Sequence, residues 1–218
     1  MDFQSFLKYV PYIAQLELPG IAAHSIMAPL ERIESLKPGM GSNAKKAAVM
    51  MLFYPKNEQT HIVLIVRNTY KGVHSAQIAF PGGKYENDDL DYAFTALRET
   101  HEEVGVSPEE IEVIKAFTPM YIPPSNFMVY PYLGVANKPL QFTADPSEVA
   151  AIIELPLAVF LSQEIVTSAA MTTSYAVAIE VPAFNIEGKI VWGATAMMLS
   201  ELKEVIKKVI KNETSLKI

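Results

Sequence analysis

Three glutamates in the most acidic part of the chain have the types and spacing that best suit chemistry. Glu99, Glu102 and Glu103 stand at positions i, i+3 and i+4, which share one side of an α-helix. Two like charges about 4 Å apart repel by roughly 4 kcal/mol at an effective dielectric near 20, and the negative end of the helix dipole disfavours carboxylates further. Carboxylate clusters suit Mg²⁺ or Mn²⁺. The pattern therefore indicates either a solvated acidic face or a divalent-cation site.

The negative charge of the chain is concentrated around these glutamates. Residues 86–103 hold seven acids and one base, Arg98, so this segment carries −6, which equals the net charge of the whole chain. The early aspartates Asp88, Asp89 and Asp91 suit the N-cap and first turn of a helix. The rest of the chain is neutral overall, which argues against binding of nucleic acid by phosphate neutralisation.

The composition sets the organisation that we expect. With 218 residues, half of them hydrophobic, the chain can bury one substantial core, and we expect a helical arm over residues 1–44 and one domain over 45–218. There is no cysteine, so metal ligands must be oxygen or nitrogen atoms. The first residues lack a basic lead followed by an apolar run, and the most apolar stretch, 47–54, is too short to span a membrane. We therefore expect a cytoplasmic protein with no membrane partner.

Hydrophobic periodicity predicts a mixed sheet with flanking helices, an α/β layered domain. Residues 1–40 indicate short helical pieces broken by proline and glycine. Strands are expected at 47–54 and 61–66, which form a hairpin, and at 77–80, 111–117, 128–135, 148–155, 176–181 and 190–192. The glutamates fall on a helix over 89–104, which Gly105 ends, and an amphipathic helix is expected over 195–211.

The helix over 89–104 is expected to have two faces. At about 100° per residue, one stripe is apolar and should pack on the core, while the three glutamates gather opposite and converge on a point off the helix surface. The stripe consists of Leu90, Ala93, Phe94, Leu97 and Val104. His101 lies nearer this stripe than the carboxylates, so we expect it to be structural or on the surface.

The residues around the glutamates resemble the Nudix box, a Gly-rich turn followed by Arg-Glu-aliphatic-x-Glu-Glu-x-Gly-aliphatic. Phe80-Pro81-Gly82-Gly83-Lys84 precedes the helix, and Arg98-Glu99-Thr100-His101-Glu102-Glu103-Val104-Gly105-Val106 closes it. The resemblance implies the Nudix fold, a mixed β-sheet between helices, and a hydrolase that cleaves a diphosphate. It also implies Mg²⁺ or Mn²⁺ held by the three glutamates and the backbone carbonyl of Gly82, with Arg98 orienting a glutamate.

Two features depart from the common form of the box. The stretch from Gly83 to Arg98 is one residue longer, so the mid-box glutamate has no clean counterpart, and Asp89 is the nearest candidate. Thr100 stands where an aliphatic residue is usual. Neither departure touches the three glutamates, but the turn geometry is affected.

The segment upstream of the box is similar to that of coenzyme A diphosphatases, which have Arg, then His-x-Gly-Gln, then Phe-Pro-Gly-Gly. Here Arg67 is followed by His74-Ser75-Ala76-Gln77 and by the glycine turn, with Ala76 in place of the usual glycine. The longer box is typical of that subfamily, and so are four further stretches. These are 123–127, 131–134, 148–150 and 191–196.

This second resemblance implies hydrolysis of coenzyme A to 3′,5′-ADP and 4′-phosphopantetheine. Arg67, His74 and Gln77 would orient the substrate, although ordinary strand-edge polarity explains each alone, and Lys84 would contact phosphate. Glu99 or Glu148 would act as the general base by family analogy. The aromatic residues Tyr121, Phe127 and Tyr130 would stack on a base or line a pantetheine channel, with core packing as the equal alternative.

Two other functions stay open from the sequence. In the first, the substrate is ADP-ribose or another nucleoside diphosphate derivative. In the second, the domain binds a nucleotide without turning it over. The intact glutamates argue against the second of these. In each case the partner is a small-molecule diphosphate, and a homodimer is compatible with the resemblance because some family members form one.

Overall fold

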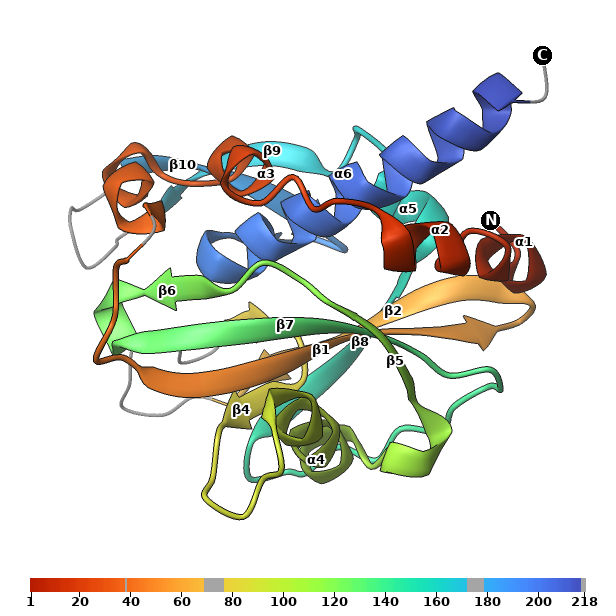
Figure 1. Cartoon of the computed structure of the whole chain (residues 1–218), viewed down its shortest axis with the longest axis horizontal. Helices are drawn as coiled ribbons and strands as arrows, with labels where there is room; N and C mark the ends of the chain where they lie inside the picture. The colour runs from red at the N-terminus through yellow and green to blue at the C-terminus, as the bar shows by residue number, and fades with distance from the viewer. Residues whose placement is uncertain (38, 69–76, 172–178, 217–218) are drawn as a thin grey trace.

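The computed structural model describes residues 1–37, 39–68, 77–171 and 179–216, which form two sheets and several helices (Figure 1). The helical elements are α1 (Phe3–Leu7), α2 (Val10–Gln15), α3 (Ile21–Ile26), the 3-10 helix η1 (Leu30–Leu36), α4 (Tyr92–Val104), η2 (Pro108–Glu110), η3 (Pro123–Ser125), α5 (Leu157–Leu161) and α6 (Gly193–Leu216). The strands are β1 (Lys45–Lys56), β2 (Gln59–Arg67), β3 (Ile78–Ala79), β4 (Gly82–Lys84), β5 (Glu112–Ala116), β6 (Met120–Ile122), β7 (Phe127–Val135), β8 (Val149–Pro156), β9 (Val166–Met171), β10 (Ile179–Ile186) and β11 (Lys189–Val191).

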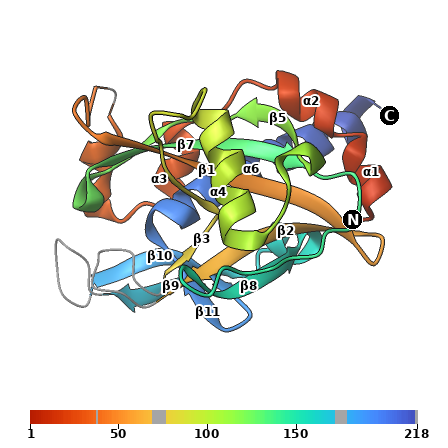
Figure 2. The ribbon, with the colours of Figure 1, turned by 90° about the horizontal axis from the view of Figure 1, so that it is seen from below.

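The larger sheet is mixed and is built around β1. This strand pairs antiparallel with β2 and β4 and parallel with β7. β2 pairs in turn with β3 and β8, and β7 pairs with β5 and β6. Figure 1 shows α6 and the N-terminal helices on one side of the sheet and α4 on the other, and Figure 2 shows α4 lying across β1 and β7. The expected fold class, a mixed sheet between helices, is confirmed.

β1 is buried on both faces, which explains its continuous apolar run. Because successive side chains of a strand point to opposite faces, Met51 and Phe53 join the core beneath α6, while Met50 and Leu52 join the core beneath α4. The predicted hairpin with β2 is confirmed, and its turn is made by Asn57 and Glu58 with φ of 48° and 64°. Two consecutive positive φ angles are typical of a two-residue hairpin turn.

The N-terminal helices pack on the sheet and belong to its core. Phe6 is fully buried, and its ring stacks on that of Phe53 at a centroid distance of 4.7 Å. The backbone N–H of Phe3 donates to the Glu58 carbonyl at 2.8 Å. Lys115 of β5 donates through Nζ to the carbonyls of Ala14 and Leu16, each at 2.8 Å, and so holds the end of α2. The arm is therefore fastened to the β1–β2 hairpin and to β5 at one edge of the large sheet.

A buried polar network also joins the arm to the C-terminal helix. His24 Nε2 of α3 lies 3.1 Å from Glu201 Oε2 of α6, and both side chains are buried. Glu201 accepts further hydrogen bonds from the Gly20 N–H at 3.0 Å and from the Thr118 hydroxyl at 2.5 Å. A buried network whose members are all hydrogen-bonded holds its partners in one arrangement. The position of α3 relative to α6 is fixed in this way.

The expected helix over 89–104 differs from the observed α4 in its start and its inner face. The helix begins at Tyr92, and the Asp91 side chain caps it by accepting from the Phe94 N–H at 2.8 Å. The predicted apolar stripe is right in part, because Val104 is buried and Leu97 packs on the core, whereas Leu90 is 86% exposed and Phe94 is also exposed. The buried residues of the helix are Thr95, Ala96, Thr100, Glu103 and Val104. Gly105 ends the helix with a φ of 77°, as predicted.

The remaining elements were predicted in part. Short helices within residues 1–40, strands β3, β5, β7, β8 and β11, and the final helix are confirmed with boundary shifts of a few residues. The strand expected at 176–181 lies partly outside the described residues, and β10 begins at Ile179. β4, β6, β9, α5, η2 and η3 were not predicted, and β9–β10–β11 forms a second, three-stranded sheet. No helix in the described part of the chain is long and apolar enough to cross a membrane.

The stacking of Phe6 on Phe53 yields a stability prediction. Phe6→Ala is expected to lower the free energy of unfolding by about 3–5 kcal/mol, because it removes a fully buried ring and leaves a cavity. Urea denaturation measures the difference. Tyr12→Ala on the same arm is the matched control, since that ring is exposed, and should change the value by less than about 0.5 kcal/mol. Equal effects of the two substitutions would show that the arm is not part of the cooperative core.

Candidate active site

The glycine turn is pressed against the central strand. β4 pairs with β1 so that Gly82 faces Val49 and Gly83 faces Ala48, and the Pro81 carbonyl accepts from the Met50 N–H at 2.8 Å. A Cβ on Gly82 would lie 2.3 Å from the Ala48 carbonyl oxygen, and its φ of 152° is one that L side chains rarely adopt. The backbone of this turn can approach the sheet only because residue 82 has no side chain.

Two of the three helix glutamates lie against this turn. A Cβ on Gly83 would meet Glu99 Oε2 at 2.3 Å, so the carboxylate occupies the space that a side chain would fill. Glu103 is only 1% exposed and accepts from the Gly82 N–H at 2.8 Å and from Arg67 Nη1 at 3.1 Å. Burial is the main cause that raises the pKa of Glu99 and of Glu103 to about 7, with the neighbouring carboxylate of Glu148 acting in the same direction and the arginines Arg98 and Arg67 opposing it. The ionised forms are thus disfavoured at this depth even beside these arginines.

The third glutamate faces another way. Glu102 is half-exposed, and its Oε2 lies 2.8 Å from Arg98 Nη1. Over the described residues, no group of three or more histidine, aspartate and glutamate side chains stands close enough together to hold a metal ion. The expectation that Glu99, Glu102 and Glu103 converge on one point therefore does not match this structure. The physical reason is that the carboxylates repel one another while Arg98 attracts Glu102.

Arg98 is held by Asp89, the residue nearest to a mid-box glutamate in the sequence. Its Nε donates to Asp89 Oδ1 at 2.8 Å and its Nη2 to Oδ2 at 3.1 Å, while Nη1 lies 3.0 Å from Glu99 Oε1. Asp89 also accepts from the Thr95 hydroxyl at 2.8 Å. The guanidinium lowers the pKa of Asp89 to about 2. Asp89 therefore anchors Arg98 beside Glu99, and the helix cap is supplied by Asp91 instead.

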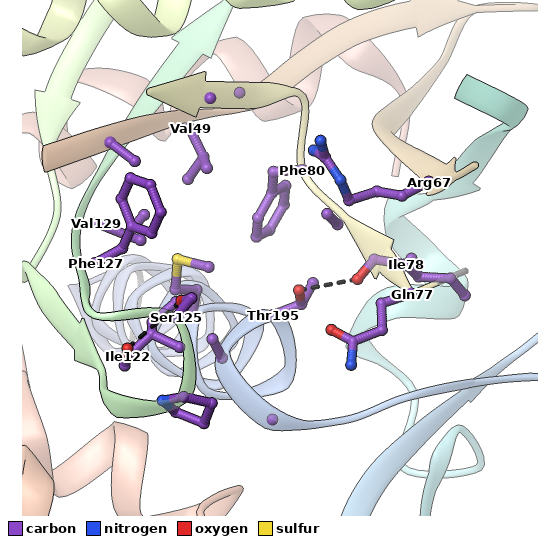
Figure 3. A pocket seen from close by; sticks show the side chains of 18 of the residues that line it. Val49, Arg67, Gln77, Ile78, Phe80, Ile122, Ser125, Phe127, Val129 and Thr195 are labelled. Atoms are coloured by element: carbon purple, nitrogen blue, oxygen red, sulfur yellow. Dashed lines mark hydrogen bonds between the residues drawn. The ribbon is translucent and has the colours of Figure 1, made fainter. Parts of the chain in front are cut away.

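Arg67 bridges two carboxylates on the other side of the turn. From the end of β2 it reaches Glu103, and its Nη2 lies 3.7 Å from Oε2 of the half-exposed Glu148. The sequence predicts that Arg67 orients the substrate, whereas in the structure Arg67 contacts the protein's own carboxylates. Gln77 points into the adjoining cavity (Figure 3). His74 lies outside the described residues.

A cavity of about 550 Å³ opens from this turn and runs between the large sheet and the start of α6. Figure 3 shows Arg67 and Gln77 on one side and Ile122, Ser125 and Phe127 opposite them. Lys84, Glu99 and Glu148 also line it. Its size lies in the range of small-molecule sites, about 300–1,000 Å³. The cavity joins most of the predicted substrate residues to Glu99 and Glu148, whereas Glu102 and Glu103 are not among its lining residues.

Two residues that line the cavity were not predicted as site residues, and one candidate residue lies outside the cavity. Thr195 of α6 lines the cavity, and its hydroxyl donates to the Ile78 carbonyl at 2.9 Å. Arg32 of the N-terminal arm also lines it, and no sequence motif pointed to that residue. The ring of Tyr130 is not among the lining side chains and stacks on Tyr92 at 4.0 Å. Tyr130 therefore packs against another aromatic ring, which is the alternative role expected for it.

The family of the chain follows from comparison with known proteins. A family model described as the NUDIX domain matches residues 44–172. The chain is 36% identical over 131 residues to a protein of Enterobacter sp. (strain 638) named uncharacterized Nudix hydrolase NudL, covering 59% of this chain and 67% of that protein. The chain belongs to the Nudix family, and this membership supports hydrolysis of a diphosphate linkage in a nucleoside diphosphate derivative.

More distant relatives agree with this family. Nudix hydrolase 15, mitochondrial, of Arabidopsis thaliana is 33% identical over 123 residues, covering 55% of this chain and 43% of that protein. Among solved structures, the Nudix hydrolase RenU of M. smegmatis is similar with a TM-score of 0.51 at 16% identity, covering 76% of this chain and 87% of that chain. At that identity the likeness supports the fold alone.

Nudix hydrolases generally use divalent metal ions such as Mg²⁺ or Mn²⁺, and the residues beside the turn fit such an ion. Glu103 is buried and Glu99 is mostly buried, and burial raises the pKa of both, so a further cation beside them would stabilise their ionised forms. All the side chains concerned offer oxygen atoms, the ligands that these cations prefer. Glu102 could join them only by leaving Arg98.

The buried pair of Asp89 and Arg98 yields a pH prediction. A carboxyl whose folded pKa is about 2, against 3.8 for the ordinary group, stabilises the fold above pH 3.8 and loses that contribution as the pH falls towards 2. Asp89→Asn should therefore cost about 2 kcal/mol at pH 7, and the difference from the parent should shrink between pH 4 and pH 2.

Urea denaturation over a series of pH values measures this difference. Asp88→Asn is the matched control, because its side chain is exposed one position away, and it should leave the curve unchanged. A gap between parent and Asp89→Asn that stays constant through the acid range would contradict the assigned pairing.

Proposed function

We propose that this chain hydrolyses the diphosphate of coenzyme A, giving 3′,5′-ADP and 4′-phosphopantetheine, with Mg²⁺ or Mn²⁺. The observation that carries the proposal is that Glu99, which is mostly buried, lines a mainly apolar cavity, and that the buried Glu103 accepts from the N–H of Gly82 in the same cavity wall. A mainly apolar cavity suits the pantetheine arm, which is long and has few charges. The likeness of residues 67–83 to the segment upstream of the box in coenzyme A diphosphatases supports the same substrate.

The proposed roles follow from what each side chain can reach. Lys84, on the strand that carries the glycine turn, lines the cavity and offers a point charge to a phosphate. Phe127 and Gln77 lie on opposite walls (Figure 3), so they would contact the arm from two sides. A bound metal ion would neutralise the diphosphate and lower the pKa of an attacking water.

Two carboxylates are candidates for the general base in this proposal. Glu99 is nearly buried beside Gly83, whereas Glu148 is half-exposed at the cavity wall and lies near Arg67. The pKa of Glu99, raised to about 7, gives that carboxyl appreciable proton affinity at neutral pH. Glu148 has freer access to solvent water. Both remain in the proposal as proton acceptors.

Substitution of the other glutamates tests the proposed metal dependence. Glu102→Gln and Glu103→Gln are each expected to reduce Mg²⁺-dependent hydrolysis of coenzyme A by at least about 100-fold, because each removes a charged ligand. Unfolding midpoints should stay close to that of the parent, since Gln is nearly isosteric. Glu110→Gln, an exposed acid outside the cavity, is the control. Full turnover by the double variant would refute the assigned metal site.

A substrate panel separates the remaining possibilities. Purified protein is incubated with coenzyme A, ADP-ribose and diadenosine polyphosphates in Mg²⁺ and in Mn²⁺, and the products are identified by mass. Release of 3′,5′-ADP and 4′-phosphopantetheine at the highest kcat/KM supports the proposal. Preferential cleavage of ADP-ribose would show that the proposed substrate is wrong and that the proposed reaction, hydrolysis of a diphosphate, is right. Calorimetric binding with no product after long incubation would favour a binding module instead.

A further inference from the structure

The N-terminal arm supplies a cation to the wall of the cavity. Arg32 of η1 is only 6% exposed, and it lines the same cavity as Glu99 and Lys84. Its Nη2 donates to the Tyr121 carbonyl at 3.0 Å, which ties the guanidinium to β6. The arm is packed on the core through Phe6 and through the His24 network, so Arg32 is carried by a fixed part of the fold.

Arg32 lies on the opposite side of the cavity from the glycine turn. In the sheet, Lys84 of β4 faces Ala47 of β1, which faces Val129 of β7, which faces Met120 of β6. Neighbouring strands are about 4.8 Å apart, so the turn and β6 are separated by roughly 14 Å. Figure 3 likewise shows Ile122 and Ser125 across the cavity from Arg67. The cation therefore stands away from the place where a diphosphate would be cut.

The charges along the cavity are unevenly distributed. Among the residues that line it, Glu99 and Glu148 are the acids, and both belong to the turn end together with Arg67. The wall beside Arg32 is apolar, with Ile122 and Phe127 among its members. An anion in such surroundings is attracted to a cation more strongly than it would be in water. The far end of the cavity is therefore suited to a negative group.

We propose that Arg32 binds a second anionic group of the substrate, a phosphate ester or a carboxylate, at the end of the cavity opposite the diphosphate. A guanidinium held in one plane recognises either group through paired hydrogen bonds, which a lysine cannot reproduce. The inference rests on one part of the proposed function, namely that the cavity holds the diphosphate of the substrate. It makes the arm a determinant of specificity as well as part of the core.

Two matched pairs of substrates test this inference and separate the two sources of the anion. Coenzyme A and 3′-dephospho-coenzyme A differ by one phosphate, and succinyl- and butyryl-coenzyme A differ by a terminal carboxylate on chains of similar length. The parent protein is expected to favour the member with the extra anionic group in one pair by about 10–100-fold in kcat/KM, the range for a hydrogen bond between charged groups. The pair that shows the preference identifies the anion.

Three variants read out the role of Arg32. Arg32→Met should bring the preferred ratio close to one while changing kcat/KM for the member that lacks the extra anionic group less than about twofold, and Arg32→Lys should keep part of the preference. Lys37→Met is the control, since it removes an exposed cation next to η1 and should change neither ratio. An equal loss for both members of a pair would instead indicate a structural role and overturn the inference.

The remaining outcomes distinguish this inference from the proposed function. A parent protein with no preference in either pair, or an unchanged preference in Arg32→Met, overturns the inference even if coenzyme A is cleaved. If no coenzyme A derivative is cleaved, the proposed substrate fails, and calorimetry with 3′,5′-ADP and 5′-AMP then tests Arg32. A preference for 3′,5′-ADP that Arg32→Met abolishes supports the inference, and equal affinities in the parent overturn it.

Discussion

The burial of two carboxylates against a backbone turn is the constraint on which the rest of the structure depends. Glu99 occupies the space that a side chain on Gly83 would fill, and Glu103 accepts from the N–H of Gly82. The turn can present its backbone there only because β4 is paired to β1, a strand buried on both faces. Negative charge at this depth is unfavourable unless positive charge lies close by. The rigid sheet therefore maintains a pair of carboxylates that a divalent ion would suit.

Two arginines hold the carboxylates in place from different elements. Arg98 comes from the same helix as the glutamates and is fixed by Asp89, whereas Arg67 comes from the end of β2 and lies between Glu103 and Glu148. Each guanidinium offers several donors in one plane, so it can orient two acceptors at once. The cluster is consequently oriented before any ion or substrate arrives, although Glu102 is drawn to Arg98 in this state.

Much of the fold and of the site could be predicted because local signals were strong. The apolar run of β1, the cap at Gly105 and the spacing of the box each have a local physical cause. The inner face of α4 could not be predicted by periodicity, since polar Thr95 and Thr100 are buried there while Leu90 is exposed. The Thr100 hydroxyl donates a hydrogen bond to the Ala96 carbonyl, which allows this polar side chain to be buried. A pattern of hydrophobic residues does not reveal such a bond. Arg32 reaches the cavity only through the tertiary packing of the arm, so no local sequence pattern marks it as a lining residue.

One residue of the turn meets two demands at once. Gly82 must lack a side chain, because a Cβ would strike the Ala48 carbonyl oxygen, and it must keep its N–H, because Glu103 accepts from it. Nineteen of the twenty amino acids fail the first demand, and proline fails both. The position thus admits a single amino acid, and its donor belongs to the main chain, where replacement of side chains one by one would never detect it.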